Sequence, residues 1–389
     1  MYPKFKYIYV LIAILSSLFL YACSEDPTSA GLSLLNNGDI ITINADSSIQ
    51  TQSAEYLKTD VKLTYSNRVL LGRYGNVRSS FLLQFNLSSV LPDSIKKELN
   101  DGTLTVSYAK IQMSPVYTLG NSTSFDFLVH KVNNLWSSNY TADSLSKLSY
   151  DAANMKIKND FNDSLYTIEL DNNKVLSWFS DSNYVNKNYG MYFEPANNVN
   201  KIVGFQAIAS SPAKSLMSMT VVFNKPGKYI DTLTFSPMND VHMVSGTLPV
   251  VNNTKLVVQG GISVSSRFQV LLPSIPETAI INSAILQLTI DSTSSVLGNP
   301  SDNSLIVKFL TDKNSTAYDT LRTTVLYKSG NVFSGNITAH LQRWINKEPN
   351  YGLMISSGNA DNNVDLFAFR EGTAANGPKL KILYTTKRK

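Results

Sequence analysis

The sequence predicts an all-β protein of two tandem jelly-roll-like β-sandwiches, each with one short capping helix. Three observations carry this prediction. Short segments such as 80–87 (SFLLQFNL) and 284–290 (AILQLTI) alternate apolar and polar residues, as half-buried strands do. Clusters of Ser, Asn, Gly and Pro separate these segments, without the strand–helix alternation of a parallel sheet. One set of motifs also occurs twice in the same order, which indicates an internal duplication.

The N-terminal residues 1–22 are predicted to be a lipoprotein signal peptide. Lys4 and Lys6 precede an apolar stretch that is too short for an ordinary membrane-spanning helix. The stretch ends in LYAC, which resembles a bacterial lipobox and makes Cys23 the expected site of lipidation. The alternative is an uncleaved anchor with a chance cysteine. Cys23 is the only cysteine, so the mature chain is expected to form no internal disulfide and no cysteine-based zinc or redox site.

Residues 23–38 are rich in Ser, Gly and Asn and are predicted to be a flexible tether. Its first part, Ser24-Glu25-Asp26, resembles a short acidic signal that directs lipoproteins of some Gram-negative bacteria to the cell surface. We therefore expect an outer-membrane protein, anchored by its lipid and facing the cell exterior. The periplasmic face is the alternative.

The composition suits an extracellular β protein. Charged residues make up 16% of the chain, below the usual share of about 25%, so Ser, Thr and Asn must supply much of the polar surface. The net charge of +5 is thinly spread, and its one cluster, at 387–389, is interpreted as a solvated end. No nucleic-acid partner is expected.

The duplication divides the chain into a first copy, 39–226, and a second copy, 227–389. The matched segments run in one order. They are 39–43 with 231–235, 81–85 with 268–272, 109–113 with 284–288, 175–179 with 341–345, 188–190 with 350–352, and 205–223 with 366–384. The first copy is longer, and its extra residues fall in polar stretches such as 139–163, where loops tolerate insertion.

The capping helices are predicted from one of these matches. Val175, Trp178 and Phe179 are spaced i, i+3, i+4, which forms one apolar face of a helix. Leu341, Trp344 and Ile345 repeat the spacing. The tryptophan of each helix is predicted to plug one end of its sandwich. A ligand-stacking role for Trp178 or Trp344 is the alternative.

Three groups of segments together resemble a known family. They are FLLQFNLSSVLPDSI with the AKIQM strand that follows, VHKVNNLWS, and NITAHLQRWINKEPNYGLMI with FAFREG and PKLKILY. These segments resemble DNRLRE-type, carbohydrate-binding-module-like domains. The hexapeptide that names the family does not occur, and each copy is degenerate. The resemblance implies a jelly-roll sandwich of a secreted or surface protein. Some relatives bind carbohydrate and others belong to adhesive or structural proteins, and the family has no shared catalytic set to carry over.

The sequence carries no catalytic motif, and we expect the protein not to be an enzyme. None of the three histidines, His130, His242 and His340, has a partner at metal-ligand spacing, and no nucleophile elbow or phosphate-binding loop occurs. A glycan-active enzyme with two carboxylates that meet only in space is kept as a third hypothesis. No cofactor is expected.

One turn could hold a structural calcium ion. Asp361, Asn362, Asn363 and Asp365 form an oxygen-rich stretch. The stretch lacks the fuller ligand spacing of a dedicated calcium loop, so a solvated turn is the favoured interpretation.

The candidate ligand-binding residues lie in a loop of the first copy. Trp136 and Tyr140 could stack on sugar rings, with Asn133, Asn134 and Asn139 beside them to bind hydroxyl groups. Packing of Trp136 against the sandwich edge is the alternative. The sequence thus favours a surface protein that binds a polysaccharide. A structural or adhesive protein that contacts other surface proteins is the second hypothesis.

Overall fold

The computed structural model describes residues 40–44, 49–58, 63, 66–87, 90–123, 125–162, 164–179, 188–208, 217–250, 255–270, 272, 275–370 and 377–386. The predicted signal peptide, the tether and Cys23 lie outside these residues. Within the described part of the chain, no helix is both long enough and apolar enough to cross a membrane.

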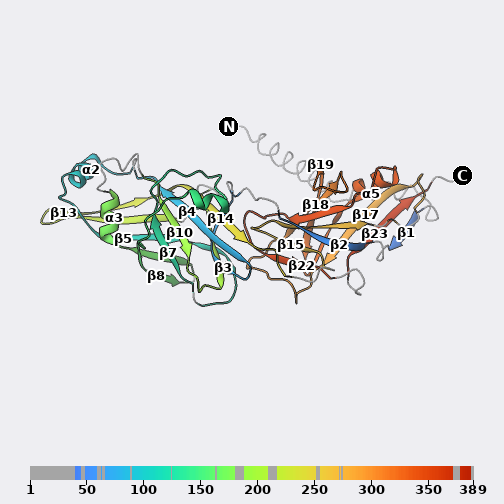
Figure 1. Ribbon diagram of the computed structural model, residues 1–389, viewed down its shortest axis with the longest axis horizontal. Helices are drawn as coiled ribbons and strands as arrows, with labels where there is room; N and C mark the ends of the chain where they lie inside the picture. The colour runs from blue at the N-terminus through green and yellow to red at the C-terminus, as the bar shows by residue number, and fades with distance from the viewer. Residues whose placement is uncertain are drawn as a thin grey trace, which may run out of the picture.

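The all-β prediction is confirmed. Figure 1 shows an elongated molecule with two β lobes, sandwich 1 and sandwich 2, placed end to end. All the paired strands run antiparallel, so short turns can join them.

Sandwich 1 consists of two sheets around one apolar core. Sheet B has the order β6 (Pro115–Leu119), β11 (Lys201–Gln206), β3 (Arg68–Tyr74), β4 (Val77–Phe85), β10 (Met191–Pro195) and β7 (Phe127–Lys131), with β14 (Pro237–Gly246) also paired to β4. Sheet C has the order β13 (Tyr229–Phe235), β12 (Ser218–Lys225), β5 (Thr105–Met113), β9 (Leu165–Leu170) and β8 (Lys156–Asn162).

Sandwich 2 is built from a single sheet, sheet A, that closes over a second core. Its order is β1 (Ile40–Asn44), β23 (Lys379–Thr385), β17 (Ile280–Thr289), β20 (Val332–Asn336), β19 (Tyr318–Ser329), β18 (Ser304–Leu310), β21 (Leu353–Ser357), β16 (Val264–Val270), β15 (Val257–Gln259) and β22 (Leu366–Ala368), with β2 (Ile49–Lys58) also paired to β16. The long strand β19 joins the two layers because it pairs with both β20 and β18.

The strand pairing corrects the predicted division into 39–226 and 227–389. Strands β1 and β2 pair with β23 and β16, so they belong to sandwich 2. Strands β13 and β14 pair with β12 and β4, so they belong to sandwich 1. The predicted boundary falls inside the β12–β13 hairpin. Because the turn of this hairpin is short, pairing of β13 with β12 costs little chain entropy. Sandwich 1 is therefore inserted between β2 and β15 of sandwich 2.

The predicted capping helices are present in both sandwiches. They are α3 (Asn172–Phe179) and α5 (Thr338–Ile345), and they bury the apolar faces predicted for them. The rings of Trp178 and Trp344 lie in the two cores, and Trp344 stacks on Phe309 with 5.5 Å between ring centroids. This contact supports the role of the tryptophans as structural plugs.

Sandwich 1 also contains two helical elements that the sequence patterns did not predict. Helix α2 (Asp93–Asn100) buries Ile95 and Leu99 in the core, one turn apart on the same face. The 3₁₀ helix η2 (Ala142–Lys147) lies in the loop that only sandwich 1 carries. Pro92 lies directly before α2, and a proline there is consistent with a helix start as well as with a turn between strands.

The repeated Asn-Tyr-Gly motif makes the same hydrogen bonds in both sandwiches. The side-chain amides of Asn188 and Asn350 donate to the carbonyls of Phe85 and Val270, each at 2.7 Å. Their Oδ1 atoms accept from the backbone N–H two residues later, at 3.2 Å and 3.0 Å. The motif therefore fastens the turn before β10 or β21 to the end of the neighbouring strand.

The glycine of the motif is required by close approach of the backbone. Gly190 and Gly352 have φ of 77° and 88°, in the left-handed region that favours glycine. A Cβ at Gly352 would lie 2.6 Å from the carbonyl oxygen of Phe268, and one at Gly190 would lie 2.3 Å from that of Leu83. The structure therefore aligns Leu83 with Phe268, two residues away from the predicted alignment of 81–85 with 268–272. The sequence could not show this offset, because an alternating strand pattern looks the same after a shift of two residues.

A candidate polar cleft between the sandwiches

An apolar contact joins the two sandwiches, and we call it the seam. Buried side chains from both sandwiches pack together there as a separate core. They are Leu70, Val77, Tyr117, Leu119 and Ile202 of sandwich 1 with Ile262, Val264 and Val364 of sandwich 2. The backbones also meet, because Thr118 and Asn299 exchange two N–H to carbonyl hydrogen bonds of 2.9 Å and 2.8 Å.

Asp365 is the polar centre of the seam. Its side chain is 0% exposed, and it accepts hydrogen bonds from the Tyr117 hydroxyl at 2.8 Å, the Gly298 N–H at 2.7 Å and the Asp302 N–H at 2.6 Å. Burial raises the pKa of Asp365 above its usual value, while these donors act in the opposite direction. Burial also raises the pKa of Tyr117, which therefore stays an O–H donor.

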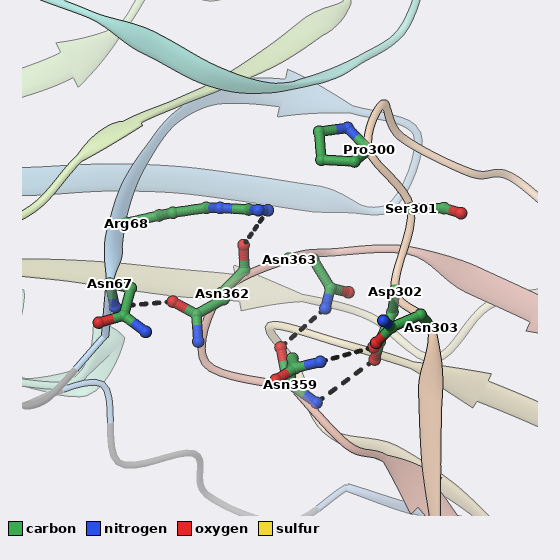
Figure 2. Close-up of a pocket in the computed structure, with 9 residues that line it drawn as sticks. All are labelled: Asn67, Arg68, Pro300, Ser301, Asp302, Asn303, Asn359, Asn362 and Asn363. Atoms are coloured by element: carbon green, nitrogen blue, oxygen red, sulfur yellow. Dashed lines mark hydrogen bonds between the residues drawn. The ribbon is translucent and has the colours of Figure 1, made fainter. Parts of the chain in front are cut away.

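A cleft of about 270 Å³ opens beside this centre, between the start of β3 and two loops of sandwich 2. Eight of its nine lining residues are polar, and Figure 2 shows the side chains. They are Asn67, Arg68, Pro300, Ser301, Asp302, Asn303, Asn359, Asn362 and Asn363. The cleft exists only because the two sandwiches meet, since residues 67 and 68 come from one and the rest from the other.

Much of the cleft wall is held by its own hydrogen bonds. The carboxylate of Asp302 accepts from the side-chain amide of Asn359 at 2.7 Å and from the Ser357 hydroxyl at 2.7 Å. The amide of Asn363 donates to the carbonyl of Asn359 at 2.7 Å. Asn362 Oδ1 accepts from the backbone N–H of Asn67 at 2.7 Å. These bonds make the wall a preorganised surface rather than a set of free side chains.

Three side chains are left to meet a ligand. The guanidinium of Arg68 lies over the Tyr117 ring, 5.6 Å from its centroid, and points toward the segment with Ser301 (Figure 2). Within the described residues it has no carboxylate partner, and its one hydrogen bond is a long 3.4 Å contact to the carbonyl of Asn362. The side-chain amides of Asn67 and Asn303 are also open within the described part of the chain, because the hydrogen bonds of these residues there use only their backbone groups.

This arrangement is better suited to binding than to proton transfer. Asp302 is the carboxylate that lines the cleft, and its oxygens already accept from Ser304, Ser357 and Asn359. A general acid or base must exchange a proton with its substrate, which such bonds oppose. Amides and a guanidinium instead offer donors and acceptors for hydroxyl groups.

The turn predicted as a calcium candidate forms one wall of the seam. Asp365 directs both oxygens at protein donors, as described above, and Asn363 Oδ1 accepts from the N–H of Asp365 at 3.0 Å. The Asp361 carboxylate accepts from the Asn362 amide at 2.9 Å. A calcium ion would have to displace these donors. No group of three or more His, Cys, Asp or Glu residues that could hold a metal occurs in the described ranges.

The loop that carries the predicted sugar-binding residues folds over the outer face of sheet B. Trp136 and Tyr140 are half-buried and pack against a small separate core of Leu82, Val132, Leu148, Tyr192, Val241 and Met243. The indole N–H of Trp136 donates to the carbonyl of Tyr189 at 2.6 Å. Asn133 and Asn139 are exposed, and the amide of Asn133 donates to Asp151 at 2.6 Å. These contacts favour packing as the role of Trp136.

The three histidines lie apart from the cleft and are buried. Burial lowers the pKa of His242 to about 3 and also lowers that of His340, so both are neutral. His130 bonds to the carbonyl of Asp151 at 2.9 Å. Among the described residues, neither ring nitrogen of His242 has a hydrogen-bond partner.

Of the cleft residues, only Asn362 and Asn363 belong to a stretch that the sequence marked, the calcium-candidate turn, and the sequence did not indicate the cleft itself. Arg68 stands alone at the start of a strand, and residues 300–303 and 359–363 look like ordinary polar turns. Comparison of the chain with protein-family models, with curated proteins and with solved structures found no match. The resemblance to DNRLRE-type domains therefore stays a prediction.

Proposed function

We propose that this protein is a lipid-anchored protein of the outer membrane, facing the cell exterior, that binds carbohydrate without transforming it. The cleft at the seam is its binding site in this proposal. The observation that carries it is the set of open donors, Arg68, Asn67 and Asn303, around a wall of fixed amide and carboxylate groups. Hydroxyl-rich ligands are recognised by such convergent polar groups.

The charge of the cleft favours a neutral saccharide. Arg68 is its one cationic lining residue, and Asp302 its one anionic lining residue. Asp361 and Asp365 lie close enough to Asp302 that its charge raises the pKa of each, although burial is the larger cause. A strongly acidic ligand would meet these carboxylates, whereas a neutral sugar needs only the hydrogen bonds.

The position of the first strand bears on how the anchor would present the cleft. Strand β1 begins at Ile40 and pairs with β23, and Figure 1 shows β1 toward the end of sandwich 2 farthest from sandwich 1. A tether that begins at a lipidated Cys23 would enter the fold there. Sandwich 2 would then lie nearest the membrane, and the seam and sandwich 1 would lie farther out.

Binding of a glycan array by the purified mature chain tests the proposal. We expect Arg68→Ala to weaken binding to any glycan hit at least tenfold, since a hydrogen bond to a charged group contributes about 1.5–3 kcal/mol. We expect the double variant Asn67→Ala/Asn303→Ala to weaken it about tenfold, since each hydrogen bond between neutral groups contributes about 0.5–1.5 kcal/mol. Arg322→Ala is the matched control, because Arg322 is exposed on β19, forms an ion pair with Asp319 and does not line the cleft. Absence of binding to every glycan, or full binding by both cleft variants, would refute the proposal.

The anchor is tested separately in cells. We expect the wild-type chain to incorporate a labelled fatty acid and to sediment with membranes, and Cys23→Ser to do neither. A Cys23→Ser chain that still sediments with membranes would contradict lipidation. Protease accessibility on intact cells distinguishes the surface from the periplasmic face.

A structural or adhesive role is the second candidate, and the interlocked fold favours it. Sandwich 1 is inserted between β2 and β15, so two chain connections and the seam core hold the sandwiches together. Such a body could act as a rigid spacer that contacts other surface proteins. Crosslinking on cells that recovers one protein partner, together with no glycan affinity, would support this candidate over the first.

A further inference from the structure

A second hollow lies on sandwich 1, on the outer face of sheet C and away from the seam. Its volume is about 330 Å³. It spans strands β5, β8 and β9, and it is lined by Tyr108, Lys158, Asn159, Asp160, Thr167 and Glu169. None of these residues lines the cleft between the sandwiches.

A β-bulge presents the aromatic residue of this hollow. In the pairing of β5 with β12, Tyr108 lies opposite Val222 and Val106 lies opposite Phe223. Ser107 therefore has no partner of its own and is the extra residue of the bulge. Val106 and Ala109 are buried in the core, and Ser107 and Tyr108 between them both lie toward solvent. Bulges commonly redirect side chains in this way near binding sites.

Sandwich 2 has the same bulge without the aromatic ring. The β17–β23 register skips between Ile281 and Ser283, which leaves Asn282 as the extra residue. Ser283 therefore stands where sandwich 1 has Tyr108. The bulge belongs to the duplicated architecture, and the tyrosine is specific to sandwich 1.

The hollow is lined by one cation, Lys158, and by two carboxylates, Asp160 and Glu169. Lys158 and Glu169 form an ion pair of 3.0 Å across β8 and β9, and Asp160 lies beside them. The Tyr108 hydroxyl has no hydrogen-bond partner among the described residues. The hollow thus combines an aromatic ring with donors and acceptors of both signs. This combination fits a neutral sugar, whose C–H face packs on a ring while its hydroxyls bond to the groups around it.

We propose that the outer face of sheet C is a second saccharide-binding surface, with Tyr108 as the stacking ring and a neutral polysaccharide as the ligand class. The inference rests on the proposed function, in that the chain binds saccharide, but it uses a different sandwich. Two sites on one rigid body raise the apparent affinity for a polymer that reaches both, and they do not do so for a short oligosaccharide.

Affinity gel electrophoresis of the whole mature chain tests the proposal, with dextran, mannan, arabinoxylan, xyloglucan and mixed-linkage β-glucan as probes. For any polymer that retards the wild type, we expect Tyr108→Ala to weaken binding about tenfold and Tyr108→Phe to change it less than about threefold, because phenylalanine keeps the ring. Tyr327→Ala is the matched control, since Tyr327 lies on β19 with 65% of its surface exposed and belongs to neither hollow.

The outcomes separate this proposal from the proposed function. If Tyr108→Ala binds like wild type while Arg68→Ala loses binding, the second surface is refuted and the seam cleft stands. If Tyr108→Ala loses binding and Arg68→Ala does not, the second surface stands and the seam cleft is refuted. If no polymer retards the wild type, the second surface is refuted, and the seam cleft is then judged by the glycan array alone. Equal urea midpoints of the variants exclude misfolding as the cause of a loss.

Discussion

Replacing Tyr117 with phenylalanine tests whether Asp365 organises the seam. The change removes one hydroxyl from a fully packed site and leaves the ring in the seam core. Asp365 keeps two backbone donors, the N–H groups of Gly298 and Asp302. Its carboxylate nevertheless loses one of the three hydrogen bonds that compensate for its burial.

The expected loss follows from that geometry. A hydrogen bond to a charged group contributes about 1.5–3 kcal/mol, and a buried acceptor that loses its donor cannot turn to water instead. We therefore expect the free energy of unfolding of Tyr117→Phe to fall by about 1.5–3 kcal/mol at pH 7. The loss should shrink at a pH where Asp365 is protonated, because a bond to a neutral group contributes only about 0.5–1.5 kcal/mol.

Urea unfolding followed by tryptophan fluorescence is the assay, with Tyr166→Phe as the matched control. Tyr166 is also a buried tyrosine of sandwich 1, but its hydroxyl has no hydrogen-bond partner among the described residues. Its loss should therefore change stability little. If Tyr117→Phe differs from Tyr166→Phe by less than about 0.5 kcal/mol, the role given to Asp365 is wrong.

Three further predictions concern the cores and turns. Trp344→Ala should lower the free energy of unfolding by about 3–5 kcal/mol, and Trp136→Ala by clearly less, because only the first ring is buried in a main core; equal losses in urea would contradict this. Burial raises the pKa of Asp240 to about 6, so the folded state favours the protonated form and stability is lost as pH rises from about 4 to above 6. Asp240→Asn should abolish this pH-dependent loss of stability, which is at most about 3 kcal/mol. If the urea midpoint of the variant depends on pH as the wild type's does, Asp240 is not the cause of the loss. Gly352→Ala should destabilise more than Gly75→Ala, because both have positive φ but only the first would press a Cβ on a carbonyl oxygen; thermal melting that ranks them the other way would exclude this cause.

Function was harder to predict than fold, and Trp136 shows why. Its loop has the aromatic and amide residues that sugar sites use, yet its indole N–H bonds to Tyr189 and its ring covers a small core. Residue type alone cannot separate a stacking surface from a packing one. Tyr108 is the reverse case, because nothing in the AKIQM strand region indicates that a bulge turns this ring toward solvent.

The sequence by itself determined the features that depend on neighbours along the chain. Alternation marked the strands because successive side chains point to opposite faces, and the i, i+3, i+4 spacing marked the faces of α3 and α5. The Asn-Tyr-Gly motif occurs in both copies, and this repetition indicated the duplication. Its glycine is needed in each copy because a Cβ there would collide with the carbonyl oxygen of the neighbouring strand.

Only the tertiary structure decided which sheet each strand joins and where the polar cleft lies. Strands β1 and β13 occupy the same place in the repeat, but β1 pairs with β23 at the far end of the chain and β13 pairs with the preceding strand, β12. The bond from Tyr117 to Asp365 joins residues 248 positions apart. Strand pairing and side-chain convergence over such separations depend on how the sheets pack, and no local pattern of residues records that.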